Sequence, residues 1–333
     1  MNIPSFFKNK RILVTGAGGF IGSHLTEALL DISAKVRAFV RYNSRNEWGW
    51  LEDLPSRKKS SIDIVPADLR DFHAVKGAMK GIDVVLHLGA LIGIPYSLNY
   101  PDDVVETNVM GTLNVLKSSL EHGIGRVIHT STSEVYGTAR YVPIDEKHPL
   151  SPQSPYAASK IAADKLAESF FNSYGLPVSI IRPFNTFGPR QSLRAIIPTI
   201  ITQLLQGKKL VVGNLKPRRD FTFVSDTVRG FILLSAAEGV EGETFNLGTR
   251  KDVAIGKLIA LIAKEIGVVP QIEMDPRRVR GNQSEVMRLL SDNSRAGKVL
   301  GWKPEFTLEE GLGATVEWLR GRGQFGKPNI YNT

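Results

Sequence analysis

The chain contains no cysteine among its 333 residues. It therefore has no disulfide framework, no thiolate nucleophile and no cysteine-ligated zinc or iron–sulfur site. It also lacks any run of the about 18 uninterrupted apolar residues that a membrane span requires. The first ten residues lack the apolar segment of a signal peptide, and the six histidines, all before residue 150, show no metal-ligand spacing. We therefore expect a cytoplasmic protein without a metal site.

Acidic residues are fewer than basic ones: 33 Asp and Glu stand against 42 Lys and Arg, a net charge of +9. Such an excess of positive charge can bind a nucleic acid, a membrane surface or smaller polyanions such as nucleotides. The basic residues are scattered in pairs, for example at 218–219 and 277–278, without the interleaved aromatic residues on which nucleic-acid bases stack. We therefore expect discrete phosphates as ligands, and neither a nucleic acid nor a membrane as a partner.

Short β-branched runs alternate with longer stretches of helical periodicity along the first half of the chain. Such alternation requires right-handed crossovers and a parallel sheet with helices on both faces. The pattern predicts an α/β protein with a doubly wound parallel sheet, the Rossmann fold. The predicted strands are 11–15, 35–40, 62–65, 83–88, 126–130 and 178–181, and the predicted helices are 20–30, 71–79, 101–122 and 155–174.

The regular alternation of strands and helices ends after residue 183. There we expect a smaller C-terminal α/β lobe over the carboxyl edge of the sheet, which is the edge at which open α/β folds bind ligands. The expected division is a dinucleotide-binding domain at 1–182, to which 221–248 returns, and a substrate lobe formed by 183–220 and 249–333. In this half, helices are predicted at 193–206, 225–237, 254–266 and 308–319, and short apolar runs lie at 210–212, 221–224 and 244–247.

A glycine-rich turn follows the first predicted strand and opens the first predicted helix. Gly16 permits the tight turn, Gly19 lets the backbone approach a pyrophosphate, and Gly22 allows the helix to pack closely on the strand. The helix N-terminus then offers free amides to the phosphates. This arrangement predicts a dinucleotide site that contains Gly16, Gly18, Gly19, Phe20, Ile21 and Gly22.

The segment after the second strand bears on the choice between NAD and NADP. An acidic residue there binds the ribose 2′-hydroxyl of NAD, whereas an arginine accommodates the 2′-phosphate of NADP. Residues 39–45 contain no acid, and Arg41 and Arg45 can pair with a phosphate. This favours NADP, although both arginines could be plain loop residues. Further cofactor contacts are expected from Asn43, Ser44, Asp68, Leu69, Leu88, Gly89 and Ala90.

Tyr156 and Lys160 are four residues apart, which places them on one face of the predicted helix 155–174. A lysine ammonium beside a phenol favours the phenolate, which can take a proton from an alcohol while hydride leaves the same carbon. Thr132, in the Ser/Thr-rich end of the fifth strand, can hydrogen-bond the same substrate oxygen. Beside a dinucleotide turn, this set predicts hydride chemistry, with Tyr156 and Lys160 also in contact with the cofactor.

These motifs together resemble the extended short-chain dehydrogenase/reductase family over nearly the whole chain. The resemblance implies a Rossmann domain with bound NAD(P), a smaller lobe that holds a nucleotide-diphosphate hexose, and a homodimer. In this family two long helices such as 101–122 and 155–174 commonly pack against those of a second copy, although burial beneath the second lobe would explain their apolar faces equally well. The resemblance to the family is carried by the glycine turn, Tyr156 and Lys160, and by the segments 182–190, 219–221, 246–248 and 300–304.

Glu134 is the residue that bears on the reaction. Residues 131–137, Ser-Thr-Ser-Glu-Val-Tyr-Gly, resemble the catalytic segment of nucleotide-sugar 4,6-dehydratases. In that reaction a ketone at C4 makes the C5 proton acidic, and a carboxylate removes it so that the C6 hydroxyl leaves as water. Ser133 stands where dTDP-linked glucose dehydratases usually carry Asp, whereas GDP-mannose dehydratases resemble this chain there. The resemblance assigns Thr132, Ser133, Glu134, Tyr156 and Lys160 to catalysis.

The segments 143–149, 153–156 and 187–191 are similar to the dehydratases of legionaminic acid biosynthesis, which act on GDP-N-acetylglucosamine. We therefore predict a 4,6-dehydratase of that sugar nucleotide. A C4 epimerase, a UDP-glucuronate decarboxylase, which shares the Thr-Ser-Glu triplet, and a noncatalytic NADP-binding sensor stay open as alternatives. Glu134 could also merely cap or pair at the strand end.

Substrate contacts are expected mainly from the second half of the chain. Asn185 is expected to hold the sugar or the first phosphate, and Arg190 belongs to the same predicted set. Arg219 and Arg280 are expected at the nucleotide diphosphate, because planar guanidinium donors match phosphate oxygens; either could instead be a surface residue. Ser97 could line the hexose pocket or cap a turn.

Overall fold

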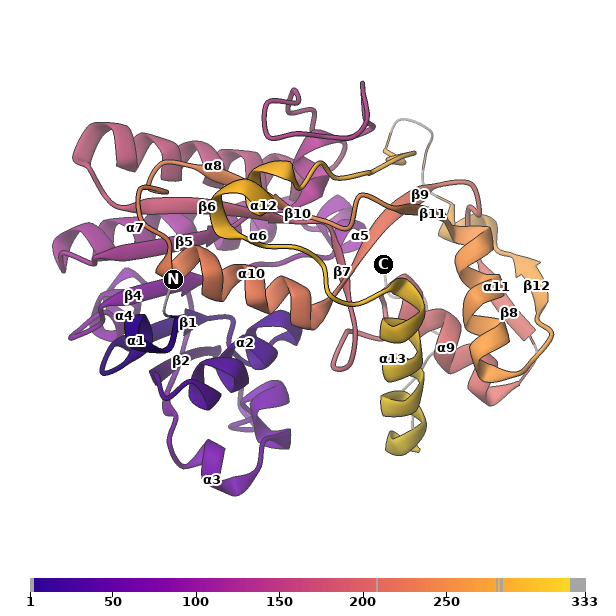
Figure 1. Cartoon of the computed structure of the whole chain (residues 1–333), viewed down its shortest axis with the longest axis horizontal. Helices are drawn as coiled ribbons and strands as arrows, with labels where there is room; N and C mark the ends of the chain where they lie inside the picture. The colour runs from indigo at the N-terminus through magenta and orange to yellow at the C-terminus, as the bar shows by residue number, and fades with distance from the viewer. Residues whose placement is uncertain (1–2, 208, 280, 282–283, 324–333) are drawn as a thin grey trace.

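The structure, a computed structural model, describes residues 3–207, 209–279, 281 and 284–323. Its centre is a seven-stranded parallel sheet with the strand order β10-β6-β5-β4-β1-β2-β3 (Figure 1). Six of these strands are those that the alternating pattern predicts, and β10 joins them at the edge beside β6, so the doubly wound α/β fold is confirmed. The strands are β1 (Arg11–Thr15), β2 (Lys35–Arg41), β3 (Asp63–Ala67), β4 (Val84–His87), β5 (Arg126–Thr130), β6 (Val178–Pro183) and β10 (Thr244–Leu247).

Helices cover both faces of this sheet, as Figure 1 shows. Because successive side chains of a strand point to opposite faces, Ile12 and Val14 of β1 belong to the core on one face and Leu13 to the core on the other. The strand β4 is buried at every position, as a central parallel strand requires. The two layers are α2 (Phe20–Asp31) with α10 (Val224–Ala236), and α4 (Phe72–Ala78) with α7 (Gly111–Glu121) and α8 (Pro155–Tyr174).

The helix predicted at 101–122 is interrupted. α6 (Pro101–Val105) passes into a π-helical turn, η2 (Glu106–Met110), before α7 begins. A π turn widens one turn of a helix without changing its residue types, so the hydrophobic pattern does not reveal it. Other missed elements are too short to show a period: α1 (Ile3–Phe7), η1 (Gly49–Asp53), α3 (Ser56–Lys59), α5 (Ile94–Asn99), η3 (Ser133–Tyr136), η4 (Pro276–Arg278) and α12 (Ser294–Leu300).

The C-terminal lobe contains two small sheets packed against helices. One sheet has the strand order β11-β9-β7 and the other pairs β12 with β8. The apolar runs at 210–212 and 221–224 fall in or beside β8 and β9, whereas the sequence did not indicate β7, β11 and β12. The elements are β7 (Asn185–Phe187), β8 (Lys209–Val212), β9 (Arg218–Phe223), β11 (Asp252–Ala254), β12 (Gln271–Met274), α9 (Ile196–Gln206), α11 (Ile255–Ile266) and α13 (Leu308–Arg322).

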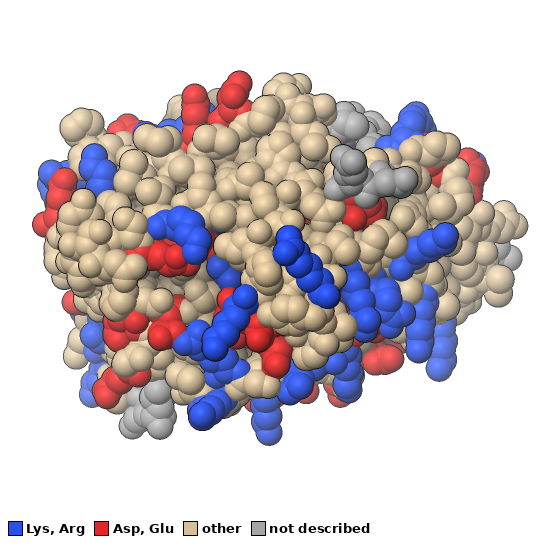
Figure 2. Space-filling view, turned by 90° about the horizontal axis from the view of Figure 1, so that it is seen from above, with Lys and Arg blue, Asp and Glu red and all other residues tan. Residues whose placement is uncertain are grey.

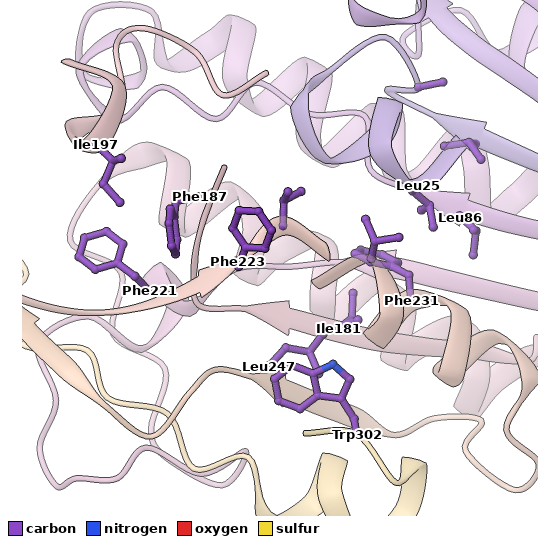
Figure 3. Close-up of a cluster of buried hydrophobic side chains, with 14 of the residues drawn as sticks. Leu25, Leu86, Ile181, Phe187, Ile197, Phe221, Phe223, Phe231, Leu247 and Trp302 are labelled. Carbon is purple, nitrogen blue, oxygen red and sulfur yellow. The ribbon is translucent and has the colours of Figure 1, made fainter. Parts of the chain in front are cut away.

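One hydrophobic core runs through both halves of the molecule (Figure 3). It joins Leu25 of α2 and Leu86 of β4 to Phe187 and Phe223 in the C-terminal lobe. The rings of Phe187 and Phe223 meet edge-on, with centroids 5.7 Å apart. Trp302 belongs to the same core, and its indole N–H donates to a backbone carbonyl of α10 at 2.8 Å. The two halves therefore share buried surface.

Acidic and basic side chains are interspersed on the face that Figure 2 shows. Several basic residues have acidic partners, among them Arg218, 2.9 Å from Asp252, and Arg277, 3.0 Å from Asp275. Within the described ranges, no helix has the length and apolar character needed to cross a bilayer. In the same ranges no three His, Asp or Glu side chains gather in a way that could hold a metal ion.

Candidate active site

The glycine-rich turn between β1 and α2 has the shape of a phosphate cradle. Gly16 has a φ of +69°, in the left-handed region that favours glycine. A Cβ at Gly22 would overlap the Gly16 carbonyl, and a Cβ at Gly18 would overlap the Trp48 carbonyl. No side chain caps α2 at Gly19, so the first amides of the helix are left for another acceptor. The residues present therefore fit the pyrophosphate of a dinucleotide.

Two neighbouring segments hold this turn. Trp50 of η1 donates its backbone N–H to the Gly18 carbonyl at 3.0 Å, a contact that the sequence gave no sign of. On the other side, the N–H of Gly89 donates to Thr15 Oγ1 at 3.0 Å, and the side chain of Leu69 lies against Gly89. The predicted contacts Leu88, Gly89 and Ala90 thus follow β4 directly beside the turn.

The loop after β2 carries the predicted 2′-phosphate site. Arg41, Ser44 and Arg45 are exposed there, and Arg45 approaches Glu47 at 3.6 Å. The Asn43 side chain acts within the loop: its Oδ1 accepts the backbone N–H groups of Arg45 and Glu47, each at 3.1 Å. Asn43 therefore shapes the loop, and both arginines lie exposed on it.

Asp68 lies at the end of β3, next to the end of β2. Arg70 binds its carboxylate, with Nη2 2.7 Å from Oδ2. The hydrogen bond from Arg70 lowers the pKa of Asp68, and the charge of Arg41 adds to that effect. Arg41 and Asp68, both predicted to contact the cofactor, are thus brought together.

Tyr156 and Lys160 lie on α8 as predicted, and both are buried, with 7% and 4% of their surface exposed. Burial raises the pKa of the Tyr156 phenol, and a hydrogen bond with Thr132 offsets part of that rise. Burial lowers the pKa of Lys160 to about 8, against an opposing effect of Asp164. In such a setting a phenolate depends on a charged ammonium on the same helix face.

Thr132 and Glu134 lie beside that helix. Thr132 caps η3, its Oγ1 accepting the N–H of Glu134 at 3.3 Å, and η3 packs against α8. Glu134 is half-buried, and after burial its carboxylate is the largest influence that raises the pKa of Tyr156. Ser133, between them, is buried. The structure thus brings Thr132 and Glu134 close to the Tyr156 phenol, with Lys160 one turn further along the same helix.

Two of the predicted substrate residues are held inside the molecule. The Oδ1 atom of Asn185 is buried and has no hydrogen-bond partner among the residues that the structure describes. Buried polar atoms are nearly always paired, so this oxygen is suited to accept a hydroxyl of a ligand. Arg219 is 7% exposed; its Nη1 donates to the Arg218 carbonyl at 3.1 Å, and its Nη2 lies 3.6 Å from Glu285. Arg219 is therefore not a surface arginine.

The other predicted substrate residues are placed differently. Arg190 binds Glu27 of α2 at 2.7 Å, so its guanidinium joins the loop after β7 to the cofactor helix. Ser97 is buried and donates its hydroxyl to the Ile94 carbonyl at 2.7 Å, which matches the turn-capping alternative. Arg280 lies outside the described residues.

Asn108 is a residue of this site that the sequence analysis missed. It lies in the π-helical turn η2, where its Oδ1 accepts the Leu91 N–H at 2.8 Å and its Nδ2 donates to the Leu91 carbonyl at 2.9 Å. Nδ2 also donates to Ser159 Oγ at 2.9 Å. The widened turn thus ties the segment after β4 to α8 next to Lys160. No local signal marks it, because the π turn is invisible in the sequence.

Comparison with known proteins covers both lobes. The family model described as GDP-mannose 4,6 dehydratase matches residues 13–315. The chain is 35% identical to a UDP-glucose 4-epimerase of Mycolicibacterium smegmatis over 325 residues, 94% of this chain and 100% of that one. A dTDP-glucose 4,6-dehydratase from Streptomyces venezuelae, solved with NAD bound, superposes with a TM-score of 0.84 at 30% identity, covering 94% of this chain and 98% of that one. A UDP-glucose 4-epimerase from Thermotoga maritima, solved with UDP-glucose, gives a TM-score of 0.86 at 28% identity and 94% and 100% coverage.

Proposed function

The chain belongs to the family of NAD-dependent nucleotide-sugar 4,6-dehydratases and epimerases, within the extended short-chain dehydrogenases/reductases, and on that premise we propose that it is a nucleotide-sugar 4,6-dehydratase. The observation that carries the proposal is the Glu134 carboxylate beside the buried Tyr156. A dehydratase needs one base for the C4 hydroxyl and a second for the C5 proton, whereas a C4 epimerase needs only the first. A carboxylate beside a buried phenol hinders ionisation of that phenol, so its presence argues for a second proton transfer.

In the proposed reaction, different side chains carry out the separate proton transfers. A bound nicotinamide dinucleotide supplies the acceptor for the C4 hydride and its later donor. Tyr156, hydrogen-bonded to Thr132, takes the C4 hydroxyl proton. We assign the stabilisation of its phenolate to charged Lys160, one turn along the same helix. Glu134 takes the C5 proton once C4 is a carbonyl. Because Ser133 offers no acid, we assign the proton for the departing C6 hydroxyl to Glu134 itself.

Atoms balance over the cycle. The C5 hydrogen and the C6 hydroxyl leave as water, and the hydride returns to C6. The proton taken from the C4 hydroxyl balances the proton that is added at C5, which gives a 4-keto-6-deoxy sugar nucleotide.

We assign GDP-N-acetylglucosamine as the substrate. The support is the sequence resemblance in 143–149, 153–156 and 187–191, together with the matching family model. Two side chains suit a sugar nucleotide: Asn185 Oδ1 can accept a sugar hydroxyl, and buried Arg219 can bind the diphosphate. We infer NADP as the cofactor from the exposed Arg41 and Arg45.

Proton NMR of the product tests the reaction. The enzyme is incubated with GDP-, UDP- and dTDP-linked hexoses, and a new C6 methyl signal is expected from GDP-N-acetylglucosamine. Glu134→Gln should abolish that signal while a transient nicotinamide absorbance still reports oxidation at C4. Normal turnover by Glu134→Gln contradicts the assignment. Inversion at C4 without a methyl signal would establish the second candidate, a C4 epimerase, which the 35% identity to a UDP-glucose 4-epimerase favours.

We further infer that two copies associate through α6, η2, α7 and α8. Val105 and Met110 are 45% and 47% exposed on this stretch, and Leu120 adds to them at 37%. Large exposed apolar side chains on neighbouring turns are typical of a protein interface. Sedimentation should give a dimer, and Met110→Arg should shift it to a monomer; an unchanged dimer would place the interface elsewhere.

A further inference from the structure

A second buried carboxylate lies one helical turn beyond Lys160. Asp164 follows it by four residues on α8, so both side chains project from the same face. Asp164 is fully buried and Lys160 is 4% exposed. Buried charges are costly unless they are paired, so the partners of Asp164 show which charges it compensates.

Two side chains donate hydrogen bonds to the Asp164 carboxylate, and a third lies near it. Arg182 of β6 donates to Oδ2 through Nη2 at 2.9 Å and through Nε at 3.2 Å. Ser131, after β5, donates its hydroxyl to the same oxygen at 2.8 Å. His129 of β5 places Nε2 3.3 Å from Oδ1. Arg182 is itself fixed, because its Nη1 donates to the Tyr136 hydroxyl at 3.0 Å.

The titratable and charged groups of this pocket come from α8, η3 and three strands of the sheet. Tyr156 and Asp164 share α8 with Lys160, and the charge of Lys160 reaches His87 on β4 and His129 on β5. Arg182 on β6 contacts Asp164, and Glu134 on η3 acts on Tyr156. Burial, together with the charge of Lys160, lowers the pKa of both histidines, so they are neutral. Arg182 is cationic and Glu134 is partly exposed to solvent. Of the groups described here, Asp164 is the one fully buried anion that faces two buried cations.

We propose that Asp164 is a positioning residue that keeps Lys160 charged, and so sets the pH range in which Tyr156 can act as a base. The proposal rests on the roles given to Tyr156 and Lys160 in the proposed function, and it extends them to a residue that touches neither substrate nor cofactor. Without the carboxylate, Lys160 and Arg182 would both be buried without the anion that compensates them. Arginine does not release its proton, so Lys160 would become neutral instead.

The pH profile tests this. Lys160 must be protonated for activity, and with its pKa at about 8 the alkaline limb of kcat/KM falls just above neutral pH. Asp164→Asn should move that limb to lower pH by about one unit or more, because a nearby counter-charge shifts a pKa by about 1–3 units. Ser131→Ala is the matched control, since it removes one hydrogen bond from the same carboxylate and leaves its charge. A limb that moves equally in both variants, or in neither, overturns the proposal.

A stability cycle tests it without any assay of the reaction. Asp164→Asn is made in the native chain and in a Lys160→Met background, and urea unfolding is measured for all four proteins. The loss of stability should be smaller in the Lys160→Met background, where one of the two cations is gone. Folding of Asp164→Asn only together with Lys160→Met supports the proposal in the same way. Equal losses, or loss of folding in both backgrounds, overturn it by showing that the carboxylate serves Arg182 alone. The cycle stands whether the reaction is a dehydration or an epimerisation, so the Glu134→Gln test fails or succeeds independently.

Discussion

The catalytic pocket combines side chains from β5, β6, η3 and α8, whereas the Asn43 side chain hydrogen-bonds only near neighbours along the chain at the loop after β2. The hydrogen bonds of Asn43 reach at most four residues along the chain, while the contact between Arg182 and Asp164 joins residues 18 apart. A change in the catalytic pocket therefore disturbs several elements at once. A change in the loop remains local, so the preference between the two cofactors can alter while the catalytic pocket is unchanged.

The largest effect is expected in the pocket. Tyr156→Phe keeps the ring and removes the hydroxyl that takes the C4 proton, so kcat should fall by about 10³-fold, within the usual range for loss of a general base. Steady-state kinetics measure the loss, and circular dichroism checks that the fold is retained. A fall of less than tenfold would mean that another group is the base.

The cofactor turn should respond less. Gly22→Ala places a Cβ against the Gly16 carbonyl, and the forced shift should cost about 1–3 kcal/mol, or about a five- to 150-fold loss of dinucleotide affinity. Gly77→Ala is the control, because a Cβ there meets no atom within 4 Å. Fluorescence titration with NADPH measures both variants. Equal affinities would show that the turn tolerates a side chain.

The loop after β2 should give a smaller and selective effect. Arg41→Ala removes an exposed charge, and pairs of this kind contribute about 1 kcal/mol at most, so NADP affinity should fall by about fivefold. NAD affinity should stay the same, because NAD has no 2′-phosphate. Titrations with both cofactors decide the matter. An equal change for the two would remove Arg41 from cofactor discrimination.

The smallest effect is expected in α3, where the three basic residues 57–59 follow one another. Arg57 of α3 is exposed, and Arg57→Ala should change the free energy of unfolding by less than about 0.5 kcal/mol. Its neighbour Lys58 differs, since its Nζ lies 2.7 Å from Asp31 and 3.2 Å from Glu27. Lys58→Ala should therefore cost more than Arg57→Ala in the same urea titration. The reverse order would mean that the ion pairs contribute nothing.

Local patterns predicted the elements that are long and periodic. The β-branched runs of β1 and β4 and the glycine turn at Gly16–Gly22 each carry their signal within a few residues, so the sheet and the cofactor loop could be predicted. The pairing of Tyr156 with Lys160 follows from helical spacing in the same way. The addition of 244–247 to the main sheet was anticipated only as part of a returning segment, because strand order depends on contacts across the whole chain.

Contacts between distant segments could not be predicted. The motif that predicts Arg190 at the substrate gives no sign that its guanidinium binds Glu27, 163 residues away. Asn43 is predicted at the cofactor, and the sequence does not show that its side chain also shapes the loop. The sequence does not reveal the role of Asp164, because its partners lie on or next to β5 and β6. The carboxylate needs a counter-charge only because it is buried, and the sequence does not show that burial. Such residues require knowledge of which strands are neighbours.

The aromatic side chains that continue from the sheet into the C-terminal lobe have a thermodynamic consequence (Figure 3). Halves joined by one interior are expected to melt together in a single transition. A sugar nucleotide that binds the folded chain but not the unfolded chain then raises the melting temperature of the entire molecule, by mass action. Heating the protein with each candidate nucleotide sugar therefore ranks its ligands before any product has been identified.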